Sequence, residues 1–159
     1  MPDQAPSRAV AALQALRVPH VATQYERANS LTEAAAQRGL TPADIVKSMV
    51  VRRGEDDYLF VLVGGDREIS WPKLRTLLGV SRLSMPSAAV ALAVTGYERG
   101  TITPFGSRHP WPVIVDADIP GRRISMGGGR HGLAIALDAD DLVSALDATV
   151  ADIADPPGL

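Results

Sequence analysis

A lysine inside an apolar run is the first residue of this chain whose placement points to chemistry. Lys47 lies between Val46 and Ser48, in a run that continues with Met49 and Val50. A lysine is rarely buried without a partner or a function, because its ammonium loses hydration among apolar side chains. The ammonium of Lys47 is therefore a candidate for substrate binding or catalysis. The alternative is that Lys47 lies at the end of an element and reaches water along its aliphatic stem.

A second candidate is a loop whose main chain, rather than its side chains, could contact a ligand. The segment from Gly96 to Gly106 contains three glycines and one proline. Glycine allows positive φ angles and close approach of another group, and proline fixes φ and removes a donor. This composition favours a rigid loop that presents N–H and C=O groups, but an ordinary irregular connection has the same composition. The candidate residues in this loop are Gly100, Thr101, Ile102, Thr103 and Pro104.

A third candidate is the glycine turn near residue 128. Gly127, Gly128 and Gly129 stand directly before Arg130. Successive N–H groups in such a turn can form a nest that binds a phosphate. A tight turn between two strands is the alternative interpretation.

Several familiar site patterns are missing from the sequence. The three histidines, His20, His109 and His131, have no spacing typical of metal ligands. No Gly-x-Ser-x-Gly motif of a serine hydrolase occurs. The Gly64–Gly65 pair is not followed by the Gly-Lys-Ser/Thr of a phosphate-binding loop, so nucleotide hydrolysis has no support.

The composition is that of a globular protein with a sizeable core. The chain has 159 residues, of which 46% are hydrophobic, and a single domain is expected. The absence of cysteine excludes disulfides, thiolate metal sites and a cysteine nucleophile. No apolar run reaches the roughly 18 residues that span a bilayer, and the N-terminus lacks a signal-peptide pattern. We therefore expect a soluble cytoplasmic protein with no membrane partner.

The net charge of −2 argues against extensive binding to duplex DNA or RNA. Local basic positions could still contact a few phosphates. These positions are Arg52–Arg53, Lys73 with Arg75, Arg99, Arg108, Arg122–Arg123 and Arg130–His131.

Hydrophobic spacing and capping residues predict the elements that must position these candidates. The expected helices are 7–16, 30–39, a short one from residue 41, 71–78, 88–94 and 138–146. The expected strands are 21–25, 47–53, 58–63, 82–84, 113–116, 123–126, 133–137 and an edge strand within 149–153. The tail 155–159 is expected to be frayed and disordered. Helices and strands do not alternate strictly, so the pattern predicts an α+β domain with a mixed sheet.

Taken together, these motifs resemble the YbaK-type aminoacyl-tRNA deacylases, which are related to the editing domain of bacterial prolyl-tRNA synthetases. The segment Pro42–Val50 resembles the lysine motif of that family, and Gly100–Pro104 fits its Gly-x-x-x-Pro loop. The segment Gly128–Leu133 resembles its late glycine-basic-glycine strand entry, and Asp140–Val143 its C-terminal helix. The similarity extends over nearly the whole chain, and the motifs follow one another in the order of the family.

The resemblance implies a single compact domain over residues 1–159, with a mixed, partly barrel-like sheet surrounded by helices. It also implies hydrolysis of the ester of a mischarged aminoacyl-tRNA, with tRNA-Pro carrying Cys, Ala or another small amino acid as the expected substrate. Lys47 and Gly100–Pro104 would be catalytic, and Ser48 with Gly127–Arg130 would bind substrate. No cofactor or metal is implied, and the expected partners are the acceptor end of the tRNA and a synthetase.

Two other functions remain open at the level of sequence. One is a non-catalytic module of the same fold that binds a tRNA end or a synthetase. The other is a hydrolase of small esters or amides. The intact Lys47 and Gly100–Pro104 favour the deacylase.

The sequence also differs from the pattern of the family it resembles. Many members have serine at the position of Gly127 and an acidic residue at the position of Ala134, and His131 stands at the basic position of the motif. The expected pocket is therefore more open and less polar than one that clears cysteine. Alanine, serine or a non-proteinogenic amino acid then remain possible substrates, with broad specificity, because apolar pockets discriminate by only about 1–3 kcal/mol per methylene.

Overall fold

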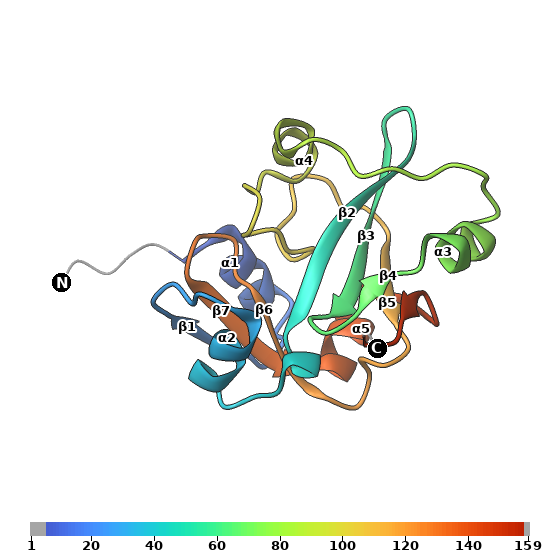
Figure 1. Ribbon diagram of the computed structural model, residues 1–159. Coiled ribbons are helices and arrows are strands. Elements are labelled where there is room, and N and C mark those ends of the chain that lie inside the picture. The colour runs from blue at the N-terminus through green and yellow to red at the C-terminus, as the bar shows by residue number, and fades with distance from the viewer. Residues whose placement is uncertain (1–5, 158–159) are drawn as a thin grey trace.

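A long antiparallel hairpin runs through the middle of the molecule. The computed structural model describes residues 6–157, and in it β2 (Val46–Gly54) pairs with β3 (Asp57–Gly64) (Figure 1). The tight turn between them contains Asp56, which has a φ of 53°. Tyr58, Phe60 and Leu62 of β3 face one hydrophobic cluster, and the alternate residues face another. Both faces of β3 are therefore covered, as its continuous apolar run predicts.

The hairpin belongs to a mixed sheet of four strands in the order β2-β3-β5-β8. The strands β5 (Val113–Asp116) and β8 (Thr149–Ala151) join it by parallel pairing. Within this sheet β2 pairs only with β3, so β2 forms one edge of the sheet.

Two smaller antiparallel sheets complete the strands. The first has the order β1-β7-β6 and consists of β1 (Val21–Gln24), β7 (Leu133–Asp138) and β6 (Arg123–Gly127). The second consists of β4 (Glu68–Ile69) and β9 (Ala154–Asp155). A parallel bridge from Ile45 to Ser125 joins the start of β2 to β6. None of the described sheets closes on itself, and the mixed α+β class is confirmed.

Helices cover these sheets and close the core. The main core lies between the four-stranded and three-stranded sheets and includes α1 (Arg8–Ala15) and α5 (Ala139–Leu146). The opposite face of the four-stranded sheet packs against α3 (Trp71–Leu78) and Ile153. The helix α2 (Leu31–Gln37) follows β1, and α4 (Ala88–Thr95) lies near the exposed edge of β2 (Figure 1).

Serine caps fix the starts of four helices. The hydroxyls of Ser7, Ser30, Ser70 and Ser87 each accept a hydrogen bond from the N–H three residues later. This contact satisfies one of the N–H groups that a helix leaves without an internal partner. These four starts are where the capping residues predict them.

Some element boundaries differ from the sequence-based expectation. The helix expected from residue 41 is only a 3₁₀ turn, η1 (Pro42–Asp44), and β2 starts at once after Ile45. The expected strand 82–84 reduces to a bridge between Ser84 and Arg52. The strand β4 was not predicted, and Asp155, expected in a frayed tail, pairs with Glu68. The last two residues of that tail lie outside the described part of the chain. Over residues 6–157, no helix is both long and apolar enough to cross a membrane.

Candidate active site

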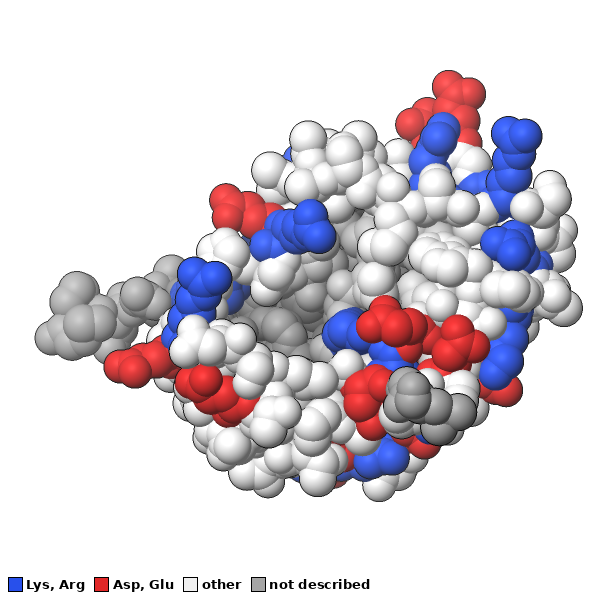
Figure 2. Space-filling view, in the orientation of Figure 1, with Lys and Arg blue, Asp and Glu red and all other residues white. Residues whose placement is uncertain are grey.

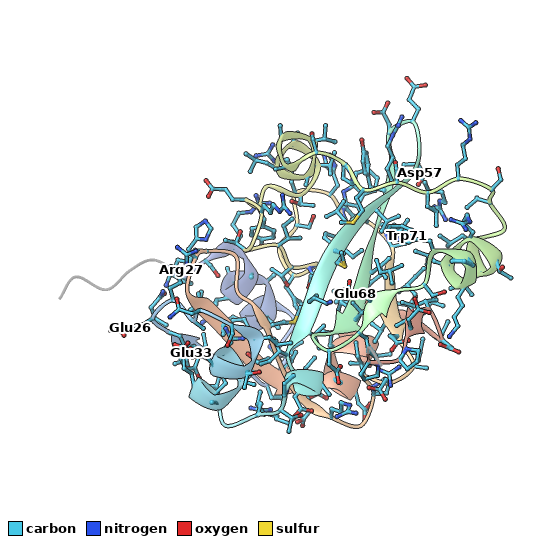
Figure 3. All side chains as sticks on the ribbon, in the orientation of Figure 1. Glu26, Arg27, Glu33, Asp57, Glu68 and Trp71 are labelled. Atoms are coloured by element: carbon cyan, nitrogen blue, oxygen red, sulfur yellow. The ribbon has the colours of Figure 1, made fainter. Side chains whose placement is uncertain are left out.

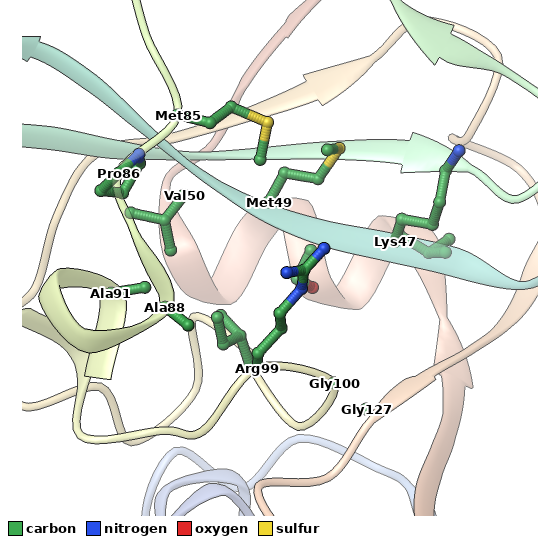
Figure 4. Close-up of a pocket in the computed structure, with 13 residues that line it drawn as sticks. Lys47, Met49, Val50, Met85, Pro86, Ala88, Ala91, Arg99, Gly100 and Gly127 are labelled. Carbon is green, nitrogen blue, oxygen red and sulfur yellow. The ribbon is translucent and has the colours of Figure 1, made fainter.

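The free edge of β2, the start of α4 and the loop around Gly100 enclose a pocket of about 490 Å³. Figure 4 shows its lining, and Figure 2 shows the hollow on this face of the molecule. The lining residues are Val46, Lys47, Ser48, Met49, Val50, Met85, Pro86, Ala88, Ala91, Arg99, Gly100, Ile102 and Gly127. Residues from three of the segments singled out in the sequence thus border one space.

Lys47 is only partly buried and its ammonium is engaged at one end of the pocket. The Nζ atom donates a hydrogen bond to the carbonyl of Arg67 and lies 3.3 Å from Oε1 of Glu68. The Lys47 side chain is 31% exposed, and the Glu68 side chain is 80% exposed. The ammonium therefore points toward the turn before β4 rather than toward Gly100 (Figure 4).

A chain of ion pairs holds the turn that receives this ammonium. Nε of Arg67 lies 3.2 Å from Oδ2 of Asp118, and Arg122 contacts both Asp118 and Asp44 at 3.2 Å. Asp44 itself accepts hydrogen bonds from the N–H and hydroxyl of Thr41. Burial alone would raise the pKa of Asp44, but the hydrogen bonds from Thr41 and Arg122 lower it below its usual range. The turn on which Lys47 rests is thus tied to the start of β2.

The main chain of β2 presents hydrogen-bonding groups to the pocket. The N–H and C=O of Arg52 pair with Ser84, on the side of β2 that faces away from β3. The N–H of Phe60 donates to the carbonyl of Pro112 rather than to β2. In an antiparallel ladder these directions alternate along the strand. The N–H and C=O groups of Ser48 and Val50 therefore point away from β3, toward the pocket. The hydroxyl of Ser48 is buried and has no hydrogen-bond partner among residues 6–157.

The loop before β5 is held by its own hydrogen bonds. The carbonyl of Thr101 accepts a hydrogen bond from the N–H of Gly129 at 3.1 Å, and the N–H of Thr101 donates to the main-chain carbonyl of Glu98. The hydroxyl of Tyr97 donates to the carbonyl of Phe105 at 2.6 Å across the loop. Burial raises the pKa of Tyr97 to about 12, so this donor keeps its proton over the usual pH range. The expectation of a rigid loop agrees with these contacts.

The five candidate residues of this loop occupy different environments. Gly100, with a φ of 89°, and Ile102 line the pocket. Thr101, Thr103 and Pro104 are buried behind them and do not line it. Within the described chain, no acceptor pairs with the N–H groups of Gly100, Ile102 and Thr103. Two residues that border the pocket on this side, Gly100 and Ile102, thus have main-chain N–H groups without an acceptor in the described chain.

The glycine turn contributes one residue to the pocket. Gly127 lines it, and a Cβ atom there would lie 3.4 Å from the carbonyl oxygen of Ile102. Gly128, Gly129 and Arg130 are not among the described lining residues. Gly128 and Gly129 instead support the loop and the turn through the bond from Gly129 to Thr101 and the packing of Gly128 on Leu133.

Ala134 does not line this pocket. It borders a separate cavity of about 120 Å³ together with Arg38, Tyr25 and Ser125. The idea that Ala134 widens the pocket around Lys47 therefore finds no support in the geometry, whereas Gly127 does leave its wall without a side chain.

Sequence reasoning missed several lining residues. Arg99 lines the pocket, although the sequence indicates only a basic position directly before Gly100 in the glycine-rich loop. Met85, Pro86 and the first turn of α4 form an apolar wall of the pocket. No local sequence pattern predicts this wall, because its position next to β2 depends on long-range packing. Among residues 6–157, no three His, Cys, Asp or Glu side chains are grouped so that they could hold a metal ion.

Comparison with known proteins places this geometry in a family. The model of the aminoacyl-tRNA editing domain matches residues 26–145. A proline–tRNA ligase of Thermoanaerobacter sp. (strain X514) is 33% identical over 115 residues, which are 71% of this chain and 19% of the ligase. The chain thus spans about a fifth of the length of the curated relatives that it matches.

Solved structures share the fold over almost the whole chain. The crystal structure of a candidate trans-editing enzyme for prolyl tRNA synthetase has a TM-score of 0.85 and 25% identity, covering 97% of this chain and all of that one. The hypothetical protein APE2540 has a TM-score of 0.85 at 23% identity, covering 94% of this chain and all of that one, which shows the fold alone. From the match of the editing-domain model and from the ligase relatives, we conclude that the chain belongs to the aminoacyl-tRNA editing domain family.

Proposed function

We propose that this protein is a trans-editing hydrolase that cleaves the ester of a mischarged aminoacyl-tRNA. The expected substrate is tRNA-Pro carrying Cys, Ala or another small amino acid, and the expected location is the cytoplasm, where such tRNAs are used. The observation that carries the proposal is that Lys47 and Ser48 border the same pocket as Gly100, Ile102 and Gly127. Membership of the editing-domain family and similarity to a candidate trans-editing enzyme support it.

The proposed reaction needs no side-chain nucleophile or metal ion. A water molecule attacks the ester carbonyl carbon, the carbonyl oxygen becomes an oxyanion, and the carbon–oxygen bond to the ribose then breaks. Of the two protons of the attacking water, one goes to the ribose oxygen and the other to solvent, and the amino acid leaves as its carboxylate. The unused N–H groups of Gly100 and Ile102 are suited to stabilise the oxyanion, because fixed backbone dipoles need no reorganisation during the reaction.

Lys47 would act through its ammonium, on the ester carbonyl or on the terminal nucleotide. In the structure this ammonium is held by Arg67 and Glu68, so it must turn about its flexible stem to reach Gly100. Because both partners of the ion pair are partly exposed, the pair itself opposes this rotation by only about 0–1 kcal/mol.

The remaining candidate residues would shape the substrate site. The hydroxyl and main chain of Ser48 would contact the aminoacyl group, since they face the pocket and have no partner in the described chain. Gly127 would leave room for that group. Gly128, Gly129 and Arg130 would act by keeping the turn in place beside Thr101, and Thr103 and Pro104 by fixing the loop from behind.

The position of the Lys47 ammonium also favours a second candidate function. A non-catalytic module of this fold would bind a tRNA end or a synthetase and would not need a lysine directed at Gly100. Multiple-turnover assays separate the two functions. With protein at a small fraction of the tRNA concentration, we expect release of the amino acid from Cys-, Ala- or Ser-tRNA-Pro, but not from Pro-tRNA-Pro. Binding of these tRNAs without any release would support the module.

A further inference from the structure

The pocket is larger than a small amino acid requires. Its volume of about 490 Å³ lies in the range of sites that enclose a drug-sized ligand. Lys47, Gly100 and Gly127 lie on one side of it, and Met85, Pro86 and α4 lie on the other (Figure 4). A small aminoacyl group beside Gly100 would leave the second side empty.

The second side of the pocket is apolar and has an open entrance. It is formed by Val50, Met85, Pro86, Ala88 and Ala91. Ala91 and Val50 are buried, whereas the Met85 side chain is exposed at the rim. The two α4 residues in the lining, Ala88 and Ala91, have small side chains, and an apolar ring placed against them would lose contact with water, which is favourable.

Arg99 lies between the two sides. Figure 4 shows its side chain extending from the loop toward β2. No ion pair or hydrogen bond engages its guanidinium in residues 6–157, whereas the neighbouring Glu98 pairs with His131 at 3.1 Å. An unpaired guanidinium at a pocket wall is well suited to a phosphate, because its planar fork donates two parallel hydrogen bonds.

The charges around the pocket favour an anion. Lys47 and Arg99 are the two charged residues in its described lining, and none of the described lining residues is acidic. The Lys47 ammonium is already paired with Glu68, whereas the guanidinium of Arg99 stands beside the apolar space without a partner in the described chain. An apolar space next to such a guanidinium and to main-chain donors has the chemistry of a nucleotide site rather than of a site for a purely apolar or cationic ligand.

We propose that Arg99 and the apolar side of the pocket bind the terminal adenylate of the tRNA. The adenine lies against Met85 and Ala88, the 5′-phosphate contacts Arg99, and the ribose with its ester reaches Gly100. This inference rests on the proposed function, because it identifies the part of the substrate that fills the space left by the amino acid. It assigns the binding of the nucleotide to α4 and to Arg99, which the sequence marks only as a basic position within the glycine-rich loop.

Direct binding of small probes tests this site without any hydrolysis. AMP, adenosine and ribose 5-phosphate are titrated into the full-length protein, and their affinities are measured by calorimetry or NMR. We expect AMP to bind about tenfold more tightly than either fragment, because each fragment lacks the base or the phosphate. Equal affinity for AMP and ribose 5-phosphate would overturn the base site, and equal affinity for AMP and adenosine would overturn the phosphate site.

Two variants with matched controls assign the contacts. Arg99→Ala should weaken AMP about tenfold and leave adenosine unchanged, whereas Arg27→Ala, at an exposed position away from the pocket, should change neither (Figure 3). Ala88→Leu should fill the apolar side and weaken both ligands, whereas Ala89→Leu, also exposed on α4 but not in the lining, should not. Both substitutions on α4 replace exposed alanines, so the fold should tolerate them.

The outcomes for the nucleotide site and for the hydrolase are distinguishable. If AMP binds with the expected pattern but charged tRNA is not hydrolysed, the adenylate site stands and the hydrolase fails. If charged tRNA is hydrolysed while neither Arg99→Ala nor Ala88→Leu changes AMP binding, the adenylate site fails and the hydrolase stands.

Discussion

Lys47 shows how a single charged residue can be placed for chemistry and yet be engaged elsewhere. Its stem follows β2, its side chain borders the pocket, and its ammonium binds the carbonyl of Arg67 and the carboxylate of Glu68. The carboxylate is mostly exposed, so solvent screens the pair. Glu68, which is labelled in Figure 3, and a substrate would compete for the same ammonium.

The first prediction concerns this competition. Glu68→Gln removes the charge that holds Lys47 near β4, so we expect a few-fold increase in the deacylation kcat/KM at low salt. The free energy of unfolding should change by no more than about 1 kcal/mol, because the pair is exposed. Steady-state kinetics and urea denaturation measure the two effects. A marked fall in kcat/KM would mean that Glu68 holds Lys47 in its productive position.

The sequence singles out Lys47 and Ser48 because a polar pair interrupts an apolar run. It does not reveal the contact with Arg67, twenty residues later, because that contact depends on how the turn after β3 folds back along the hairpin. Local patterns identify residue types that are costly to bury, whereas their partners come from tertiary packing.

At the scale of elements, the loop and the glycine turn form one unit. The N–H of Gly129 donates to Thr101, and the N–H of Gly128 donates to Leu133 at the start of β7. A Cβ at Gly128 would lie 2.8 Å from Cγ of Leu133, whereas one at Gly127 would meet nothing nearer than 3.4 Å. The two neighbouring glycines therefore differ in their tolerance of a side chain.

The second prediction compares these two positions. Gly128→Ala should lower the free energy of unfolding by about 1–3 kcal/mol, because Leu133 and its backbone must shift. Gly127→Ala should change it by less than about 1 kcal/mol and serves as the matched control. Urea denaturation of both variants measures the difference. Similar losses of stability for the two would contradict this account of the turn.

The elements themselves are mostly evident from the sequence. Ser7, Ser30, Ser70 and Ser87 mark helix starts, and a continuous apolar run predicts the buried strand β3. The two-residue strand β4 is not evident, because its pairing with β9 requires residues more than eighty positions apart. The open edge of β2 is likewise a consequence of sheet order, which no local pattern specifies.

At the scale of the whole molecule, charged side chains join segments distant in sequence. Asp44, Arg67, Asp118 and Arg122 form one network around the start of β2. The lowered pKa of Asp44 means that its carboxylate form is stabilised in the folded state. Folding is therefore linked to the ionisation of this residue.

The third prediction follows from the sign of that linkage. Because the folded-state pKa is lowered, the stability that Asp44 contributes is complete above the ordinary aspartate pKa of about 4 and is lost as the pH falls through the folded-state value. Asp44→Asn should lower the free energy of unfolding by about 1–2 kcal/mol at pH 7. This difference from wild type should shrink in acid, as measured by denaturation across pH. A difference that is constant with pH would contradict the linkage.

The α+β class follows from the sequence because the predicted helices and strands do not alternate strictly. The family follows because three motifs occur in the right order along the chain. The apolar wall of α4 and the position of Arg99 do not, since several exposed apolar residues resemble an ordinary surface until they border β2. The space that would receive the nucleotide is therefore a property of the assembled molecule.

The most direct test of the account is the single-turnover rate of Ala-tRNA-Pro hydrolysis by wild type and by Lys47→Ala. We expect wild type to release alanine well above the uncatalysed rate and Lys47→Ala to be slower by at least about a hundredfold, because a charged contact to the ester is lost. Lys73→Ala, which removes the other lysine of the chain and its ion pair with Asp152, is the matched control and should retain the wild-type rate. Hydrolysis by Lys47→Ala at the wild-type rate would contradict the proposed role of this pocket.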